Sequence, residues 1–210
     1  MSVNTFSRQE IIAFLVAEKA LRFGEFTLKS GAKSPFFINL GDICSGSALQ
    51  YVGQAFAQKI KQDFGSVQIL FGPPYKGIAL ITATAMAWQQ LYGEDVFTCY
   101  NRKEAKAHGE AGMFVGKMPQ KSDRIIVIDD VLTTGGTKLE AIQMVESTFD
   151  VMVQGIVVTV DRRLKGQDSG LGSYPLSALV TLQDVVDYLR EKGDSRAQLM
   201  ADFYEGRYHG

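Results

Sequence analysis

Residues 129–137 bring together side chains that suit a sugar phosphate. The run reads Asp-Asp-Val-Leu-Thr-Thr-Gly-Gly-Thr, so a pair of carboxylates is followed by threonine hydroxyls and adjacent glycines. Hydroxyl groups and backbone N–H groups beside flexible glycines can bind a phosphate. The carboxylates of Asp129 and Asp130 would repel one. We therefore expect a ligand that carries a phosphate at one end and neutral hydroxyl groups, free or metal-bound, further in.

The segments that flank this run predict a strand, a tight polar turn and a helix. Residues 124–128 end in Ile-Ile-Val-Ile, which is typical of a buried strand, and apolar residues recur at helical spacing across 138–149. A turn that opens a helix directs backbone N–H groups and the positive end of the helix dipole at one point, which makes an anion site. The Gly-Lys-Ser/Thr sequence of a nucleoside triphosphatase loop is absent.

A second glycine-rich turn could supply a cation. Residues 72–77 read Gly-Pro-Pro-Tyr-Lys-Gly, after a short apolar run at 68–71 and before a helical pattern that reaches about residue 92. This repeats the order strand, turn, helix and places Lys76 between glycines, where it can meet an anion. A plain surface lysine is the alternative interpretation.

The segment 101–112 could supply several more cations. It follows a predicted strand at 96–100 and contains no large apolar residue, so it should be exposed and mobile. On composition alone it could equally be a solvated loop. Its potential cations are Arg102, Lys103, Lys106 and His108.

Strands and helices alternate from residue 68 onward, which predicts an α/β fold with a doubly wound, mostly parallel sheet and helices on both faces. Later strands are expected at 155–160 and 177–181. Later helices are expected at 183–192 and 197–204. Ligands bind at the C-terminal ends of the strands in such sheets. The loops that should meet there are 72–77, 101–112, 129–137 and 161–163.

The part of the chain before residue 68 is expected to form a helix, a hairpin and a second helix. Ser7 and Glu10 have the spacing of a capping box, and the first helix should run to about Phe23. Residues 25–39 alternate around a turn at Ser30-Gly31, which predicts a β-hairpin. The second helix is expected at 47–64.

The composition is that of a cytoplasmic globular protein. The 210 residues fit one domain, 46% are hydrophobic, and the formal net charge of -1 provides no overall basic field for nucleic acid. The two cysteines, Cys44 and Cys99, form no metal-ligand pattern and no disulfide framework. The sequence shows neither a signal peptide nor an apolar run of membrane-spanning length.

Four stretches together resemble one family. The acidic pair followed by Thr-Thr-Gly-Gly-Thr resembles the signature of the type I phosphoribosyltransferases, which bind 5-phosphoribosyl 1-pyrophosphate (PRPP), and 72–77 resembles their pyrophosphate loop. Phe-Thr-Leu-Lys-Ser-Gly at 26–31, followed by Lys-Ser-Pro, resembles the N-terminal hood of the orotate phosphoribosyltransferases. Residues 101–112 resemble the catalytic loop of their bacterial members. The resemblance weakens after Gly166.

The resemblance implies a type I phosphoribosyltransferase fold over residues 1–210, with a small hood mainly at 1–45 and a lid loop at 101–112. It implies transfer of ribose 5-phosphate from PRPP to orotate, which gives orotidine 5′-monophosphate and pyrophosphate in de novo pyrimidine synthesis. It also implies Mg²⁺ held mainly by substrate oxygens and water, with no direct protein ligand. Finally, it implies a homodimer in which each catalytic loop reaches into the neighbouring subunit's site.

The resemblance also assigns residues. The catalytic residues that it implies are Lys103, Lys106, His108, Asp129 and Asp130. Those implied to bind PRPP are Lys29, Tyr75, Lys76, Arg102, Lys103, Lys106, His108, Asp129, Asp130, Val131, Leu132, Thr133, Thr134, Gly135, Gly136 and Thr137. Those implied to bind orotate are Phe37, Ile38, Thr133 and Arg162, with Arg163 as the alternative one position away.

The sequence departs from the family pattern at two places. Thr-Thr-Gly-Gly-Thr stands where close relatives often have Thr-Ala-Gly-Thr, so the alignment of Gly136 and Thr137 is open by one position. Phe37-Ile38 stands where an aromatic pair is common, so Ile38 would contact orotate through its backbone only.

Two rival functions deserve comparison. A purine phosphoribosyltransferase would share the acidic turn but should lack both the hood sequence and the Arg-Lys-Glu-Ala-Lys-X-His loop. A regulatory protein that binds PRPP and nucleic acid would be expected to show a basic face or an added helix-turn-helix, together with a degraded loop. The net charge of -1 and the intact loop disfavour the regulatory protein.

Overall fold

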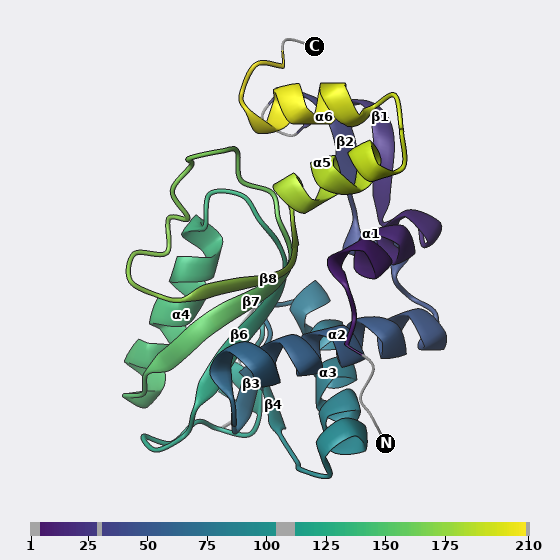
Figure 1. Ribbon diagram of the computed structural model, residues 1–210. Coiled ribbons are helices and arrows are strands. Elements are labelled where there is room, and N and C mark those ends of the chain that lie inside the picture. Colours follow the sequence, from purple (N-terminus) through teal and green to yellow (C-terminus); the bar gives the residue numbers. More distant parts are fainter. Residues whose placement is uncertain (1–4, 29–30, 104–111, 209–210) are drawn as a thin grey trace.

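The computed structural model describes residues 5–28, 31–103 and 112–208 (Figure 1). The predictions for Lys29, Lys106 and His108 fall outside these residues. The first elements in chain order are α1 (Arg8–Ala17), β1 (Leu21–Thr27), β2 (Lys33–Ile38), η1 (Leu40–Asp42), α2 (Gly46–Phe64), β3 (Ile69–Phe71), α3 (Lys76–Tyr92) and β4 (Phe97–Asn101). They are followed by β5 (Phe114–Gly116), β6 (Ile125–Leu132), α4 (Gly136–Phe149), β7 (Val153–Asp161), β8 (Leu176–Thr181), α5 (Leu182–Glu191) and α6 (Ala197–Tyr204).

The central sheet has the predicted doubly wound character. Its strand order is β5-β4-β3-β6-β7-β8, and every neighbouring pair from β4 to β8 is parallel. The short edge strand β5 runs antiparallel to β4 and was not predicted. The strand order steps outward from β3 in both directions, so the loops after β3 and β6 leave the sheet side by side.

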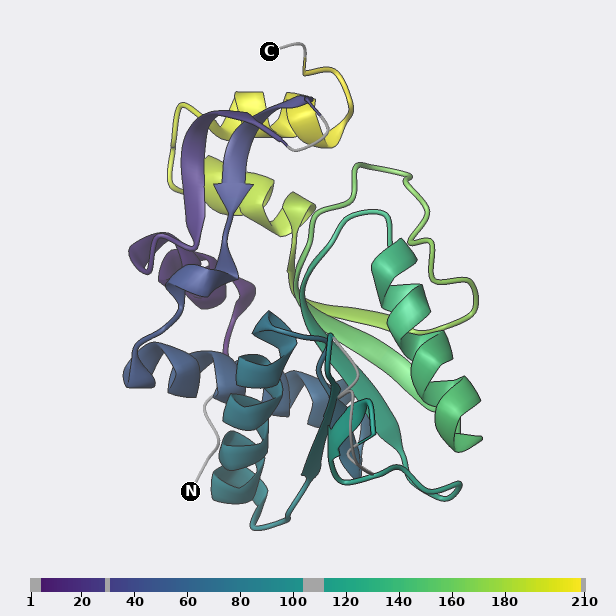
Figure 2. The same ribbon diagram turned by 180° about the vertical axis from the view of Figure 1, so that it is seen from behind.

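Helices cover both faces of the sheet (Figures 1 and 2). α2 and α3 lie on one face and α4 lies on the other. Successive side chains of a strand point to opposite faces, and β6 shows this clearly. Ile126 and Ile128 belong to the core cluster that contains α2 and α3, whereas Ile125 and Val127 belong to the cluster of α4. Apolar side chains on both faces explain the continuous apolar run of this strand.

A smaller layer stands over the C-terminal ends of the strands. The antiparallel hairpin β1–β2 packs against the C-terminal helix α6 (Figure 2). The rings of Phe36 in β2 and Phe203 in α6 meet edge to face at 5.2 Å. Arg8 of α1 forms an ion pair with Asp184 of α5 at 2.6 Å. Segments from both ends of the chain therefore build this layer.

The first helix begins as predicted but ends early. Ser7 and Glu10 form the capping box, yet the helix stops at Ala17, and the expectation that it reaches Phe23 is wrong. Lys19 takes a left-handed backbone conformation with φ of 59°, which breaks the helix. The next residues pair with β2, so the hairpin begins at Leu21.

The strand before the predicted phosphate-binding turn (residues 133–137, hereafter the phosphate turn) is longer than predicted. β6 continues through both aspartates to Leu132, because these residues pair with β7 as far as Asp161. The turn is consequently confined to 133–135, and α4 begins at Gly136. In the ranges that the structure describes, no helix combines the length and apolar character needed to cross a membrane.

Candidate active site

The predicted loops meet at the C-terminal ends of the parallel strands. β4, β3, β6 and β7 are neighbours in that order and run parallel, so the segments that follow them emerge together. Of the loop after β4, the structure describes the beginning, to Lys103, and the end, from Gly112.

The acidic pair is held between two lysines. Asp129 pairs with Lys138 at 2.8 Å, and Asp130 pairs with Lys76 at 2.8 Å. Burial raises the pKa of Asp129, Lys138 opposes that shift, and the adjacent Asp130 adds to it. Lys138 therefore favours the ionised form of Asp129, although the side chain of Asp129 is only 15% exposed.

The sequence interpretation did not include Lys138. Its signal was present, because a lysine in the first turn of a helix sits against the positive end of the dipole and needs a compensating partner. Asp129 is that partner.

The turn after β3 brings three predicted residues together. The Pro74–Tyr75 peptide is cis, and Lys76 begins α3. Tyr75 is exposed, and the Nζ atom of Lys103 lies 4.5 Å from the centre of its ring. A Cβ on Gly77 would lie 2.8 Å from the carbonyl carbon of Gly72, so the two ends of the turn approach closely enough to require glycine.

Arg102 lies where the loop after β4 begins. Its backbone N–H donates to the carbonyl oxygen of Met113 at 2.6 Å, which joins the two ends of the loop. The Nε atom of Arg102 is buried and has no hydrogen-bond partner among the residues with described positions. A guanidinium with an unpaired nitrogen, next to Lys103 in the chain, suits a polyanion.

The phosphate turn exposes backbone and hydroxyl groups. Thr133, Thr134, Gly136 and Thr137 are exposed, whereas Leu132 points into the core. Gly135 caps α4 with φ of 74°, and no described side chain caps this helix end. The first N–H groups of α4 are therefore available to an anion.

The two arginines after β7 differ in their partners. The guanidinium of Arg163 donates hydrogen bonds from Nε and Nη2 to the carboxylate of Asp161, with Nη2 to Oδ2 at 2.7 Å. Arg162 forms no ion pair with any described acidic side chain, and its guanidinium lies 5.0 Å from the ring centre of Phe36. Burial lowers the pKa of Arg162. Arg162 is thus the arginine available to a ligand carboxylate.

The two phenylalanines of the hood strand β2 face opposite sides. Phe36 is buried beside Arg162, whereas Phe37 faces the other way and stacks on Phe26 at 5.5 Å. Alternation along β2 causes this difference. Phe36 was not among the predicted residues. Ile38 packs partly buried against the core, on the same face of the strand as Phe36.

Among the residues that the structure describes, no group of three or more His, Cys, Asp or Glu side chains could hold a metal ion. Oxygen ligands near the expected ligand come from Asp129 and Asp130, and a lysine already neutralises each of them. This donor set fits a cation that is carried mainly by substrate oxygens and water.

Comparisons with known proteins identify close relatives. The chain is 38% identical over 209 residues to the orotate phosphoribosyltransferase of Clostridium acetobutylicum, which covers 95% of this chain and 93% of that protein. It is 39% identical over 193 residues to the orotate phosphoribosyltransferase of Agathobacter rectalis, which covers 87% and 85%. The crystal structure of orotate phosphoribosyltransferase from Francisella tularensis superposes with a TM-score of 0.80 at 29% identity, covering 99% of this chain and 100% of that one. A scan against protein-family models found no match.

Proposed function

The chain belongs to the orotate phosphoribosyltransferase family, and we propose that it transfers ribose 5-phosphate from PRPP to orotate in de novo pyrimidine synthesis. The observation that carries this proposal is the unpaired guanidinium of Arg162 beside Phe36, at the sheet edge that also holds the acidic pair and the phosphate turn. The planar guanidinium fork of Arg162 can bind the carboxylate of orotate through two hydrogen bonds.

The acidic pair would act on the ribose. Asp129 and Asp130 would accept hydrogen bonds from the ribose hydroxyls, and their charge would favour the positive charge that develops at the anomeric carbon. The 5′-phosphate would bind at 133–137, where exposed threonine hydroxyls and the N-terminus of α4 meet.

The leaving pyrophosphate would be bound by cations from two loops. Lys76 follows Tyr75 in the chain, the Nζ atom of Lys103 lies over the Tyr75 ring, and Arg102 precedes Lys103. Lys106 and His108 of the loop would complete this set, and His108 could also donate a proton. Lys29 would lie beside the base and the PRPP. Mg²⁺, when bound through PRPP oxygens and water, would neutralise charge on the pyrophosphate.

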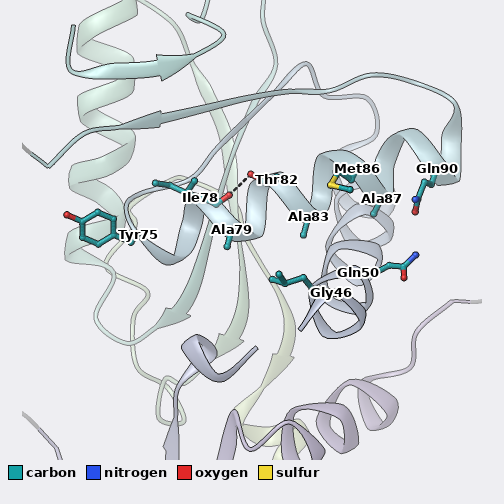
Figure 3. A pocket seen from close by; sticks show the side chains of 11 residues that line it. Gly46, Gln50, Tyr75, Ile78, Ala79, Thr82, Ala83, Met86, Ala87 and Gln90 are labelled. Carbon is teal, nitrogen blue, oxygen red and sulfur yellow. Dashed lines mark hydrogen bonds between the residues drawn. The ribbon is translucent and has the colours of Figure 1, made fainter. Parts of the chain in front are cut away.

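We also propose that a second copy of the chain covers an apolar groove along α3. The groove has a volume of about 500 Å³, and Leu49, Ile78, Ala79 and Met86 contribute to its lining. Met86 is 64% exposed. Figure 3 shows Tyr75 at one end of the helix and Gln90 at the other. An occupant of the groove would therefore lie beside residues 72–77, the pyrophosphate turn after β3. A shared active site requires this position.

The activity is tested by following the loss of orotate with PRPP and Mg²⁺, with adenine, hypoxanthine and uracil in parallel. We expect orotate-dependent release of pyrophosphate and no reaction with the other bases. If PRPP binds but no base is consumed, the regulatory alternative replaces the enzyme.

The base site is tested with Arg162→Lys, which keeps the charge but removes the planar fork. We expect the KM for orotate to rise roughly 10- to 100-fold, because a hydrogen-bonded charged contact is weakened. The KM for PRPP should stay near that of the unaltered enzyme. Arg163→Lys is the matched control, since Arg163 already has Asp161 as its partner. An equal effect of both variants on the KM for orotate would contradict the assignment.

The shared site is tested by mixing Lys103→Ala with Asp129→Asn subunits. If Lys103 acts in the partner's site, random mixing restores about a quarter of full activity, since half of the dimers are mixed and each has one intact site. Lys103 lies over Tyr75 of its own chain, which favours action within one subunit as the alternative. That alternative predicts no recovery of activity.

The proposed contact between two copies is tested with Met86→Glu, which should separate the subunits in sedimentation experiments.

We place the protein in the cytoplasm. Cys44 and Cys99 are both free thiols, which suits a reducing compartment.

A further inference from the structure

Two dipeptides from different loops contact each other reciprocally behind the phosphate turn. Thr134-Gly135 lies in the turn after β6, and Ser169-Gly170 lies in the loop after β7. A Cβ on Gly135 would collide with the backbone oxygen of Ser169, and a Cβ on Gly170 would collide with the backbone oxygen of Thr134. Each glycine thus directs a Cα hydrogen at the carbonyl oxygen of the other dipeptide, which is the arrangement of a weak C–H···O contact.

Both positions depend on glycine for a second reason. The φ angles are 74° at Gly135 and 68° at Gly170, in the left-handed region that other residues rarely adopt. Neither the close approach nor the backbone conformation tolerates a side chain.

The contact determines which way one peptide of the phosphate turn faces. In a trans peptide the C=O and N–H groups point in opposite directions. Because the Thr134 oxygen faces Gly170, the N–H of Gly135 points away from the loop after β7. An anion site needs N–H groups turned inward, and a flipped peptide would present a carbonyl oxygen to the phosphate instead.

We infer that the Ser169-Gly170 backbone is a positioning element that holds the Thr134–Gly135 peptide with its N–H toward the 5′-phosphate of PRPP. This inference rests on the proposed function, which assigns the 5′-phosphate to the turn. Ser169 and Gly170 are not assigned a contact with substrate in this proposal. They act through the turn in front of them.

Core packing and hydrogen bonds hold the loop after β7 in place. Leu171 is fully buried in the core cluster of α4, and the carboxylate of Asp168 accepts the N–H of Gly170 at 2.8 Å. Arg163, already fixed by Asp161, donates to the carbonyl oxygen of Gln167 at 3.1 Å. The ion pair between Arg163 and Asp161 therefore also supports the loop that contacts the phosphate turn.

The test compares Gly170→Ala with Gly172→Ala. Gly172 lies in the same loop with φ of 60°, but a Cβ there meets no atom within 4 Å. Both variants carry the same backbone strain, and only Gly170→Ala pushes on the Thr134 oxygen. Ribose 5-phosphate serves as the probe of the phosphate turn, and pyrophosphate serves as the probe of the turn after β3.

We expect Gly170→Ala to weaken ribose 5-phosphate binding at least tenfold relative to Gly172→Ala, while pyrophosphate binding changes less than twofold. In turnover, the KM for PRPP should rise while the KM for orotate stays constant. Equal affinity of the two variants for ribose 5-phosphate would overturn the inference. If the unaltered enzyme itself does not bind ribose 5-phosphate, the assignment of the turn in the proposed function fails as well.

If Gly170→Ala does not fold, the variant Asp168→Ala tests the inference instead. Asp168 is exposed, so its removal should be tolerated, and the variant loses the hydrogen bond that orients Gly170. Loss of a nearby negative charge would by itself favour a phosphate. Weaker binding of ribose 5-phosphate therefore supports the positioning role, and unchanged or tighter binding refutes it.

Discussion

The two lysines of the acidic pair differ in their freedom to move. The side chain of Lys138 is 11% exposed and that of its partner Asp129 is 15% exposed, whereas the side chain of Lys76 is 45% exposed. In the proposed site, Lys76 would therefore leave Asp130 when pyrophosphate binds, while Lys138 would stay with Asp129. One lysine holds a carboxylate in place and the other can be exchanged between a carboxylate and the ligand.

The role of Lys138 leads to a prediction about pH. Lys138→Met removes the main influence that opposes burial, so the pKa of Asp129 should rise further. Because the proposed role of Asp129 requires its ionised form, activity should be lost at a higher pH as the solution is acidified. Measurement of kcat/KM against pH should show the acid limb displaced to higher pH.

The control for this experiment is Lys121→Met. Lys121 pairs with Asp150 at the surface, where both side chains are more than four-fifths exposed, at 83% and 89%. This variant should leave the pH profile in place. A Lys138→Met enzyme whose activity falls equally at every pH would show that Lys138 does not act through the ionisation of Asp129.

At the scale of elements, α5 depends on a reciprocal cap. The Oγ1 of Thr181 accepts the N–H of Asp184 at 3.2 Å, and the carboxylate of Asp184 accepts the N–H of Thr181 at 2.7 Å. Asp184 also forms an ion pair with Arg8 of α1. Thr181 is the last residue of β8, the strand beside β7, so this cap sets the direction in which the chain leaves the sheet.

We predict that Thr181→Ala lowers the free energy of unfolding by about 1 kcal/mol, the usual cost of a lost N-cap. Urea titrations at one fixed protein concentration would measure this as a lower midpoint. Ser147→Ala is the matched control, because its hydroxyl bonds only to the carbonyl of Met144 within α4. That variant should be neutral or slightly stabilising. Equal losses for the two variants would contradict a capping role for Thr181.

The sequence allowed prediction of elements whose signals are local. The capping box of Ser7 and Glu10, the left-handed Gly135 and the apolar run of β6 all follow from neighbouring residues. The end of α1 did not, because Arg22 and Phe23 are drawn into a strand by partners at 36–37, and such pairing overrides local propensity. The three-residue strand β5 carries too short a pattern to detect.

The same distinction holds for the candidate site. The turns at 72–77 and 129–137 could be recognised because glycine and hydroxyl patterns are local. The contacts of Lys138 with Asp129 and of Phe36 with Arg162 could not, because they depend on where a helix begins and on which face of a strand a side chain lies.

At the scale of the whole molecule, the two thiols lie in contrasting environments. Cys44 is exposed, whereas Cys99 is buried in β4 and burial raises its pKa to about 11. At pH 8 about one Cys99 thiol in a thousand would be ionised even if a reagent could reach it.

We therefore predict that a disulfide reagent such as dithionitrobenzoate titrates one thiol per native chain and both of the two thiols in denaturant. Cys44→Ser should remove the native reaction. Rapid reaction of Cys99 in that variant would mean that β4, and with it the edge of the sheet beside the pyrophosphate turn, opens readily.

The aromatic and cationic contacts around Arg162 join residues from distant parts of the chain. Phe36 comes from the N-terminal hairpin, Arg162 follows β7, and Phe203 belongs to the last helix. During synthesis on a ribosome the chain emerges from its N-terminus, and a domain generally folds as a unit. The contacts around Arg162 could therefore not close until α6 had left the tunnel. A nascent chain without α6 would lack Phe203 beside Arg162, so the proposed base site would be the last part of the molecule to be completed.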